Sequence, residues 1–457
     1  MSGSAQHEVF TGWGRTVPTR AEVWEPRQTD DVARLVEATD GAKGGRGIVA
    51  RGLGRSYGDA AQNGGGRVIR CTGLDRILEV DVAKGTCTVE AGVSIETLMR
   101  VFLPLGWFPM VVPGTRYVTV GGAIASDIHG KFRHGCFSDS VERMTVATAG
   151  RGVVTARPDD DVFLATAGGM GLTGVVTEAT LQLQPAATAH MIVDTEQAVD
   201  VDDCMTRMLD TDDRYRYSVA WIDCGQTGKH LGRSVLTRGN HAALDDLPAR
   251  KRPTARAFAP HTLARLPNIV PDGLVNPLSI RAFNELWFRK APRERRDQVQ
   301  SITAFFHPLD AILDWNRVYG PNGFVQYQFV VPYGAEHVVR HALEQLSAQH
   351  CPSLLAVLKR FEHDSKAMLG FPASGWTLAL DVPALVALRT GLLDRLDEQV
   401  VAAGGRVYLS KDARLRKEHL PAMYPQLHRW REVRAALDPR HALTSDMDRR
   451  LDLAGSR

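Results

Sequence analysis

The stretch RGLGRSYGD, residues 51–59, directly follows an apolar segment, residues 47–50, that has the pattern of a short strand. Its three glycines leave backbone N–H groups uncovered and allow the chain to turn sharply and approach a ligand closely. A glycine-rich turn at the end of a strand is therefore typical of a phosphate site. The spacing, G-x-G-x-x-x-G, matches neither the Walker loop nor the dinucleotide fingerprint, so a purely structural turn is the alternative.

The composition is that of a soluble globular enzyme. The chain has 457 residues, 44% of them hydrophobic and 23% charged, and a formal net charge of only +3. Its length suits two or three domains. Because the net charge is so small, we do not expect a nucleic-acid partner.

Cysteine spacing and hydropathy exclude several other classes. The six cysteines form neither a C-x-x-C pair nor a metal-ligand pattern, so we expect reduced thiols and no metal site. We find neither a signal-peptide core nor an apolar window of about 18 residues, and we expect a soluble or peripheral protein. Lys and Arg are concentrated in residues 251–296. Such a run indicates a solvated surface, a site for an anionic head group or contact with an anionic membrane.

Periodicity predicts the main elements. Helix patterns occupy residues 29–38 and 94–102, and strands are predicted at residues 47–50, 68–70, 77–81, 86–91 and 175–185. A boundary falls after the last of these strands. Beyond it, the chain mixes strands such as 324–331 with helices such as 336–349, and the Pro- and Arg-rich tract 248–280 is predicted to be a long loop. A final helix over residues 425–439 is predicted to close the chain.

Two further glycine-rich stretches have different meanings. GMGLTG, residues 169–174, satisfies G-x-G-x-x-G, but a helix pattern precedes it and a strand follows it. That order is the reverse of a nicotinamide site, which we therefore do not expect. The stretch 113–131, PGTRYVTVGGAIASDIHGK, is rich in Gly, Ala, Ser and Thr. So many small residues make room for a large, flat ligand.

Four motifs, in this order along the chain, resemble the FAD-binding domain of the vanillyl-alcohol oxidase or p-cresol methylhydroxylase (PCMH) superfamily: RGLGRSYGD, TCTVEAGVSIETL, PGTRYVTVGGAIASDIHGK and GGMGLTGVVTEAT. Over nearly its whole length the chain is similar to the flavoprotein oxidase subunits of decaprenylphosphoryl-β-D-ribose 2′-epimerases. TGWGRT (11–16), SDIHGK (126–131) and YLSKDAR (408–414) contribute to this similarity. The resemblance implies an α+β fold with a PCMH-type FAD-binding domain (1–187), a substrate domain on an antiparallel sheet (188–403) and a C-terminal segment (404–457) that returns to the first domain.

The resemblance also implies a non-covalent FAD cofactor. Related oxidases often bond the flavin to a His in the first loop, whereas this chain has Arg55. The first loop would hold the pyrophosphate, and the second loop would line the flavin. The implied cofactor residues are Arg51, Gly52, Leu53, Gly54, Arg55, Ser56, Tyr57, Gly58, Asp59, Gly114, Thr119, Val120, Gly121, Gly122, Ser126, Asp127, Ile128, His129, Val176 and Tyr408.

Oxidising a secondary alcohol with a flavin requires a base for the hydroxyl proton. The resemblance places Lys411 beside the flavin and the sugar. Lys411 could act as that base only if its pKa were lowered from its usual value, and otherwise it would be an orienting cation. His129 and Tyr57 are the other candidates, and either could also simply hydrogen-bond the cofactor loops.

The substrate wall is predicted from strand alternation together with the resemblance. Gln326 and Gln328 lie two apart in a strand and share a face, which is either a substrate wall or a polar outer face. The implied substrate residues are Trp221, Gln326, Gln328, Lys359, Thr377, Ala379 and Lys411. Mycobacterial members have Asn and Cys at the positions of Thr377 and Ala379 and Tyr at that of Phe306, so the pocket differs in detail.

The function implied is oxidation of the 2′-hydroxyl of a polyprenyl-phosphoryl ribose to a ketone, in the synthesis of cell-wall arabinan. A separate NADH-dependent reductase would be the partner, with peripheral membrane contact and a cytoplasmic or periplasmic-face location. Two alternatives are a sugar or aldonolactone oxidase that uses oxygen directly, and a subunit that holds flavin without catalysis.

Overall fold

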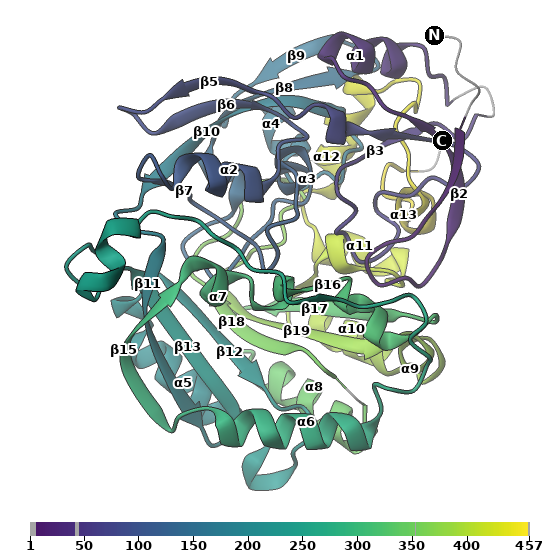
Figure 1. The fold of residues 1–457 in the computed structure, drawn as a ribbon. Coiled ribbons are helices and arrows are strands. Elements are labelled where there is room, and N and C mark those ends of the chain that lie inside the picture. Colours follow the sequence, from purple (N-terminus) through teal and green to yellow (C-terminus); the bar gives the residue numbers. More distant parts are fainter. Residues whose placement is uncertain (1–5, 42–44, 352, 456–457) are drawn as a thin grey trace.

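The computed structural model describes residues 6–41, 45–351 and 353–455. Figure 1 shows two parts, one above the other, and the first strands of the chain build two sheets in the upper part. A four-stranded sheet has the order β1-β2-β4-β3, with β2, β4 and β3 mutually parallel. Its strands are β1 (Gln6–Phe10), β2 (Thr19–Trp24), β3 (Ile48–Arg51) and β4 (Arg67–Arg70). The loop RGLGRSYGD therefore begins where β3 ends.

A six-stranded antiparallel sheet forms the rest of the upper part. Its order is β5-β6-β10-β8-β9, with β7 also paired to β10. The strands are β5 (Ile77–Asp81), β6 (Thr86–Glu90), β7 (Trp107–Pro109), β8 (Val141–Thr148), β9 (Gly152–Ala156) and β10 (Val175–Pro185). The accompanying helices are α1 (Thr29–Glu37), α2 (Ile95–Phe102), α3 (Val120–Ala125) and α4 (Asp161–Thr166). Ser94 starts α2 by accepting the Thr97 amide, at 3.0 Å.

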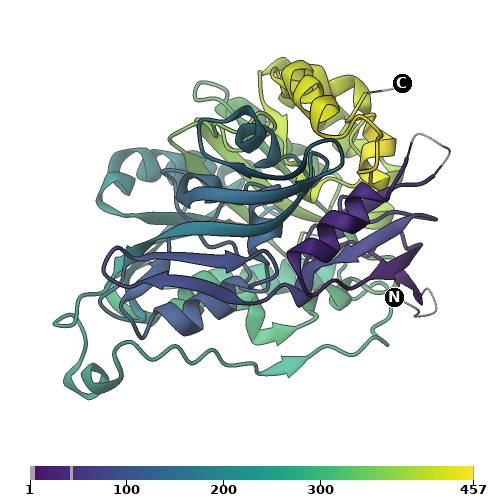
Figure 2. The ribbon, with the colours of Figure 1, turned by 90° about the horizontal axis from the view of Figure 1, so that it is seen from above.

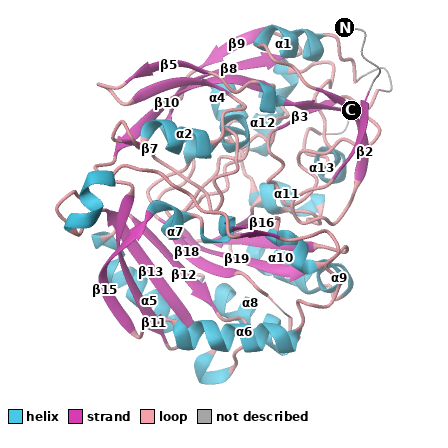
Figure 3. Ribbon diagram, viewed as in Figure 1, coloured by secondary structure: helices cyan, strands magenta, loops and turns pink. Residues whose placement is uncertain are grey.

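An eight-stranded antiparallel sheet forms the lower part, in the order β15-β11-β13-β12-β18-β19-β17-β20. Figure 3 shows its strands in magenta with helices against one side. The strands are β11 (His190–Ala198), β12 (Tyr217–Ile222), β13 (Ser234–His241), β15 (Glu294–Ser301), β17 (Phe324–Val331), β18 (Ala356–Phe361), β19 (Gly375–Pro383) and β20 (Arg406–Val407). The helices of this part are α5 (Val201–Thr211), α6 (Pro277–Lys290), α7 (Ile302–Phe306), α8 (Glu336–Ala348), α9 (Ala384–Arg389) and α10 (Leu392–Ala402). A short parallel pair joins β14 (Ala264–Arg265) and β16 (Ile312–Leu313).

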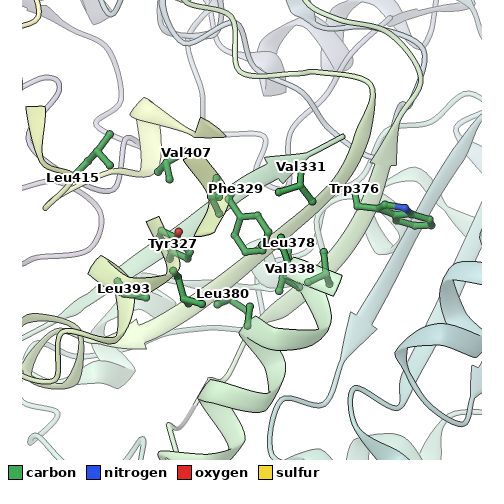
Figure 4. Packing of buried hydrophobic residues seen from close by; sticks show 14 of the residues in the cluster. Tyr327, Phe329, Val331, Val338, Trp376, Leu378, Leu380, Leu393, Val407 and Leu415 are labelled. Carbon is green, nitrogen blue, oxygen red and sulfur yellow. The ribbon is translucent and has the colours of Figure 1, made fainter. Parts of the chain in front are cut away.

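Strand alternation gives this sheet one face for the core and one for a site. Tyr327 and Phe329 of β17 join Leu378 and Leu380 of β19 in a buried cluster with α5, α8 and α10 (Figure 4). Each fully buried Leu or Phe contributes roughly 1.5–3 kcal/mol to folding. The residues that alternate with them, such as Gln326 and Gln328, must therefore project from the opposite face, toward the upper part.

The C-terminal segment returns to the upper part after β20. Its helices are α11 (Leu420–Met423), α12 (Leu427–Leu437) and α13 (Asp446–Leu451), and Figure 2 shows this yellow segment beside α1. Leu443 pairs with Ile48, and Trp430 donates its indole N–H to the Ala165 carbonyl at 2.9 Å. Because Leu443 is bridged to Ile48, β3, the strand that leads into the first glycine loop, is held by a residue almost 400 positions later.

Two predicted elements are wrong in detail. The helix predicted to close the chain, α12, is followed by α13, which Ser445 starts by accepting the Asp448 amide at 3.1 Å. The tract 248–280 is not one uninterrupted loop, because it contains a 3₁₀ turn at Ala249–Thr254, the strand β14 and the start of α6. The α+β class and the antiparallel sheet of the second part are confirmed. No described helix has the length and apolar character needed to span a bilayer.

Candidate active site

One large cavity lies between the glycine loops of the upper part and the free face of the eight-stranded sheet. Its volume is about 950 Å³, near the top of the range of roughly 300–1,000 Å³ usual for ligand pockets. The loop after β3 and the stretch 113–131 form one wall. Strands β12, β17, β18 and β19 supply the other, and Tyr408 and Lys411 reach it from the C-terminal segment.

The first glycine loop presents backbone to this cavity because side chains would not fit. A Cβ on Gly52 would lie 2.2 Å from Oγ1 of Thr119, in the second loop. Gly54 has a φ of +65°, in the left-handed region that favours glycine. Both loops line the cavity, so their amides can face a ligand that binds between them.

Charged side chains anchor the first loop. Arg51 donates to the carbonyls of Thr11 (2.8 Å) and Ala61 (2.9 Å), and Arg55 stacks 3.9 Å from the ring centre of Trp13. Burial lowers the pKa of Arg55, but a guanidinium keeps its charge at neutral pH. Asp59 turns away from the cavity to pair with Arg450 at 2.7 Å. Side chains at the start, middle and end of the loop therefore hold it in place.

The second loop is ordered by caps and by a tyrosine from the far end of the chain. Thr119 accepts the Gly122 amide at 3.2 Å and starts α3. The Tyr408 hydroxyl donates to the Ser126 carbonyl at 2.8 Å. Asp127, with a φ of +39°, accepts from the Ser138 amide at 3.0 Å. Its carboxylate also accepts from the Ser365 hydroxyl, so it ties the second loop to two segments outside it.

His129 lies in a buried polar network at the junction of loop and sheet. Lys359 Nζ is 3.0 Å from Nδ1 of the ring and 2.9 Å from the Gly130 carbonyl. Gln328 Nε2 is 3.1 Å from the ring Nε2 and 2.9 Å from Oγ1 of Thr377. Burial lowers the pKa of His129 well below its usual value. The ring is therefore neutral at physiological pH.

A second polar cluster consists of Lys411, Tyr57, Gln326 and Asp381. Lys411 Nζ lies 5.4 Å from the centre of the Tyr57 ring. Burial lowers the pKa of Lys411 to about 8, although the Asp381 carboxylate opposes the shift. Asp381 accepts from Gln326 at 2.6 Å and from Tyr319 at 3.2 Å, and burial raises its pKa to about 7. Burial raises the pKa of Tyr57 far above its usual value, so its hydroxyl keeps its proton.

The cavity continues away from these groups to an apolar end. Trp221 of β12 and Phe283 and Trp287 of α6 line it there, with Trp287 in ring contact with both of the others. Lys131 also lines the cavity, and burial lowers its pKa to about 7. One end is thus polar and enclosed, and the other is aromatic and open.

Most residues predicted for the site line this single cavity. They are Arg51, Gly52, Leu53, Gly54, Arg55, Ser56, Tyr57, Gly114, Thr119, Gly121, Gly122, Ser126, Ile128, His129, Val176, Trp221, Gln326, Lys359, Ala379, Tyr408 and Lys411. Six others are not among the lining residues: Gly58, Asp59, Val120, Asp127, Gln328 and Thr377. Gln328 still contacts the lining residue His129, and Thr377 is linked to it only through Gln328.

Sequence reasoning missed Trp13, Lys131 and Asp381. Asp381 follows Thr377 and Ala379 at the same two-residue spacing, so alternation could have found it. Trp13 stands in TGWGRT, but no local pattern indicates that it stacks on Arg55, some 40 residues later. Lys131 belongs to the polar end of the second loop, and its burial depends on Phe305, whose carbonyl it contacts.

The described residues contain one other cluster with ligand chemistry. His134, Glu362 and His363 place ligand atoms within 4.8 Å of one another. Glu362 already pairs with Arg133 and with Arg360, the latter at 3.2 Å. Two guanidinium charges at the same carboxylate oppose a metal cation, so we assign no metal to it.

The cavity fits FAD. Two closely packed glycine loops suit a pyrophosphate, and the small residues of the second loop leave space for a flat ring. Gln326 lines the cavity, and its Oε1 is buried and has no partner within the described part of the chain. Buried acceptors normally find a donor, which a ligand would supply. The residues that would hold FAD are those of the two loops, with Tyr408.

Comparisons with known proteins agree with this assignment. Residues 21–157 match a family described as an FAD binding domain. A decaprenylphosphoryl-β-D-ribose oxidase of Mycolicibacterium smegmatis is 42% identical over 448 residues, 97% of each chain. An uncharacterised protein of Streptomyces coelicolor is 40% identical over 79% of this chain and all of its own. An L-gulono-1,4-lactone dehydrogenase of Mycobacterium tuberculosis is 22% identical over 97% of this chain and 99% of its own.

Proposed function

This chain belongs to the decaprenylphosphoryl-β-D-ribose oxidase family of FAD-dependent oxidoreductases, and on that premise we propose that it oxidises the 2′-hydroxyl of a polyprenyl-phosphoryl ribose to a ketone. The observation that carries the proposal is the near full-length identity of 42%, which spans both walls of the cavity. When bound, FAD supplies the acceptor for the hydride that leaves the sugar carbon. The protein must then supply position and a base.

We assign the base to Lys411. At its pKa of about 8, a useful fraction is neutral near physiological pH, and a neutral amine can take the hydroxyl proton. Tyr57 cannot serve, since its raised pKa keeps it protonated. His129 is neutral, but both ring nitrogens are already engaged, by Lys359 and Gln328. His129 therefore holds position, and Lys411 moves the proton.

The sheet face orients the sugar. Gln326 is held by Asp381 at 2.6 Å, which leaves its Oε1 free to accept from a sugar hydroxyl. Lys359 and Lys131 add donors in the same cavity. The apolar end, with Trp221 and Trp287, suits the start of a polyprenyl chain, and Arg265, which also lines the cavity and pairs with Asp314 at 3.4 Å, is a candidate for its phosphate.

The ketone product must be reduced elsewhere to complete an epimerisation. We propose a separate NADH-dependent reductase as the partner, because GMGLTG at residues 169–174 lies between α4 and β10, the reverse of a nicotinamide site. Contact with a membrane is also part of the proposal, since a polyprenyl-phosphate substrate resides in lipid. These two points concern partners and not the oxidation itself.

Anaerobic reduction of the flavin tests the function. We expect polyprenyl-phosphoryl ribose to bleach the flavin absorbance and free ribose or arabinose to leave it unchanged. A matched comparison uses an aldonolactone in air. Turnover of the lactone with hydrogen peroxide at a comparable rate would instead assign the chain to the sugar oxidases. A flavin that no alcohol reduces would mean that the cofactor is structural.

A further inference from the structure

Helix α6 leaves much of its apolar surface exposed. Its two buried residues are Ile280 and the polar Asn284, which is only 1% exposed and donates to Asp223 at 2.8 Å. Leu278 and Leu286, by contrast, are 78% and 68% exposed. A surface helix of a globular protein normally shows the opposite arrangement. The outward apolar side, together with Phe283 and Trp287, is here termed the α6 face.

The segment that leads into α6 continues this character. Residues 261–276, the strap, run along the molecule in the teal-green trace of Figure 2 and connect β14 to the start of the helix. Leu263 and Ile269 are 80% and 86% exposed, and Leu274 is also exposed. So many exposed large apolar side chains in one segment mark an interaction surface.

The cavity opens at the α6 face. Phe283, Trp287 and Arg265 line the cavity and are at the same time solvent-exposed. Trp287 packs edge-on against Trp221, with ring centres 6.5 Å apart, so the aromatic end of the cavity is continuous with the outer face of the helix. Whatever covers this face also covers the entrance.

The charge around the α6 face is strongly positive. Residues 250–290 contain eight Lys and Arg and only two Asp and Glu. Arg281 and Lys290 are exposed and have no ion-pair partner within the described part of the chain. An exposed apolar side that includes Trp and Phe, flanked by basic residues, is the pattern of a helix that lies in a membrane interface.

We propose that the α6 face and the strap dock onto an anionic lipid bilayer, with the cavity opening onto the lipid. The docking itself rests on exposure and charge, and the uptake of a lipid substrate through this entrance rests on the proposed function. A second copy of the chain is a poorer occupant, since it would bring the same positive charge against this surface. An acidic protein partner is the outcome that the test must separate.

Vesicle binding of the full-length, FAD-loaded chain tests the docking without any substrate. We expect co-sedimentation with vesicles of phosphatidylcholine and phosphatidylglycerol, little with phosphatidylcholine alone, and loss in high salt. The double variant Leu278→Asn/Leu286→Asn should bind at least about tenfold more weakly, because apolar insertion drives such binding. Neither leucine lines the cavity.

A matched control is the pair Leu385 and Leu388, which are exposed on α9 outside this region. Leu385→Asn/Leu388→Asn should bind vesicles as the unmodified protein does. Equal loss in both double variants, or no preference for anionic lipid, would overturn the proposal. Self-association that Leu278→Asn/Leu286→Asn abolishes, seen by sedimentation without lipid, would also overturn it by assigning the face to protein contact. Retained flavin confirms that each variant is folded.

Different experimental outcomes would contradict the membrane docking and the proposed function. With detergent-dispersed polyprenyl-phosphoryl ribose, the flavin of the α6 double variant should be reduced at the normal rate. With vesicle-embedded substrate, its rate of flavin reduction should fall by about the same factor as its vesicle binding. If vesicles bind but no substrate bleaches the flavin, the proposed function is wrong and the docking stands. If substrate bleaches the flavin but vesicles do not bind, the docking is wrong and the function stands.

Discussion

Lys359 Nζ lies 3.0 Å from Nδ1 of His129, so one of these two nitrogens donates a hydrogen bond to the other. Gln328 Nε2 donates to the ring Nε2 at 3.1 Å and to Thr377 at 2.9 Å. The Nε2 atom is therefore an acceptor, and Nδ1 carries the hydrogen. Lys359 then accepts as a neutral amine, consistent with burial and neighbouring lysine charges that lower its pKa well below its usual value.

We expect His129 to stay neutral, as the Nδ1–H tautomer, between about pH 6 and 8, where an ordinary histidine titrates. Nitrogen chemical shifts of ¹⁵N-histidine-labelled protein measure this, and the His129 signals are those absent from a His129→Gln variant. An Nε2–H tautomer would contradict the prediction, because Nδ1 would then be the acceptor and Lys359 the donor.

Replacing Lys411 by Ala should lower the rate of anaerobic flavin reduction by at least about 10²-fold while FAD stays bound. In the unmodified protein, this rate should rise with pH through about 8 and then level, because the neutral amine is the active form. Lys411→Arg is the matched variant: a fixed cation should be as slow as Ala. A rate that falls above pH 8, or an active Arg variant, would make Lys411 an orienting cation.

The Asp381 carboxylate raises the pKa of Lys411 against the larger effect of burial. Asp381→Asn keeps an acceptor for Gln326 but removes the charge. The pKa of Lys411 should fall further, and the rising limb of the pH–rate profile should move to lower pH. Stopped-flow reduction across the pH range measures the shift. A limb that stays in place would show that the titrating group is not Lys411.

FAD should be released into the supernatant by acid precipitation. Arg55 occupies the loop position at which related oxidases carry a flavin-linked His, and a guanidinium stacked on Trp13 cannot form that bond. Absorbance of the supernatant and the pellet measures the partition. Flavin that remains with the pellet would reveal a covalent link elsewhere.

Ala379 lines the cavity and offers no nucleophile. Nitroaromatic compounds that the reduced flavin converts to electrophilic nitroso forms should therefore bind reversibly here. Ala379→Cys should restore a covalent adduct, since a thiolate at this position can attack the nitroso nitrogen. Intact-mass spectrometry after turnover tests both proteins. An adduct in the unmodified chain would show another nucleophile within reach, and none in the Cys variant would place Ala379 away from the ring.

The sequence by itself determined the features that depend on neighbouring residues. Glycines in RGLGRSYGD and a strand before them predicted the turn at the end of β3, and Ser94 predicted the start of α2. Two-residue alternation placed Gln326 and Gln328 on one face, because successive strand side chains point to opposite sides. These rules use only local sterics and hydrogen bonding.

Tertiary structure decided what depends on distant residues. The lowered pKa of Lys411 arises from burial at a position where Tyr57, more than 350 positions earlier, is a neighbour, and the lowered pKa of Lys359 arises from burial and the charges of Lys411 and Lys131. Likewise, the orientation of α6 depends on Asn284 bonding Asp223, just after β12, and on the burial of Ile280, which together leave Leu278 and Leu286 outside. Desolvation and packing sum over atoms close in space, and the order of residues along the chain does not record that proximity.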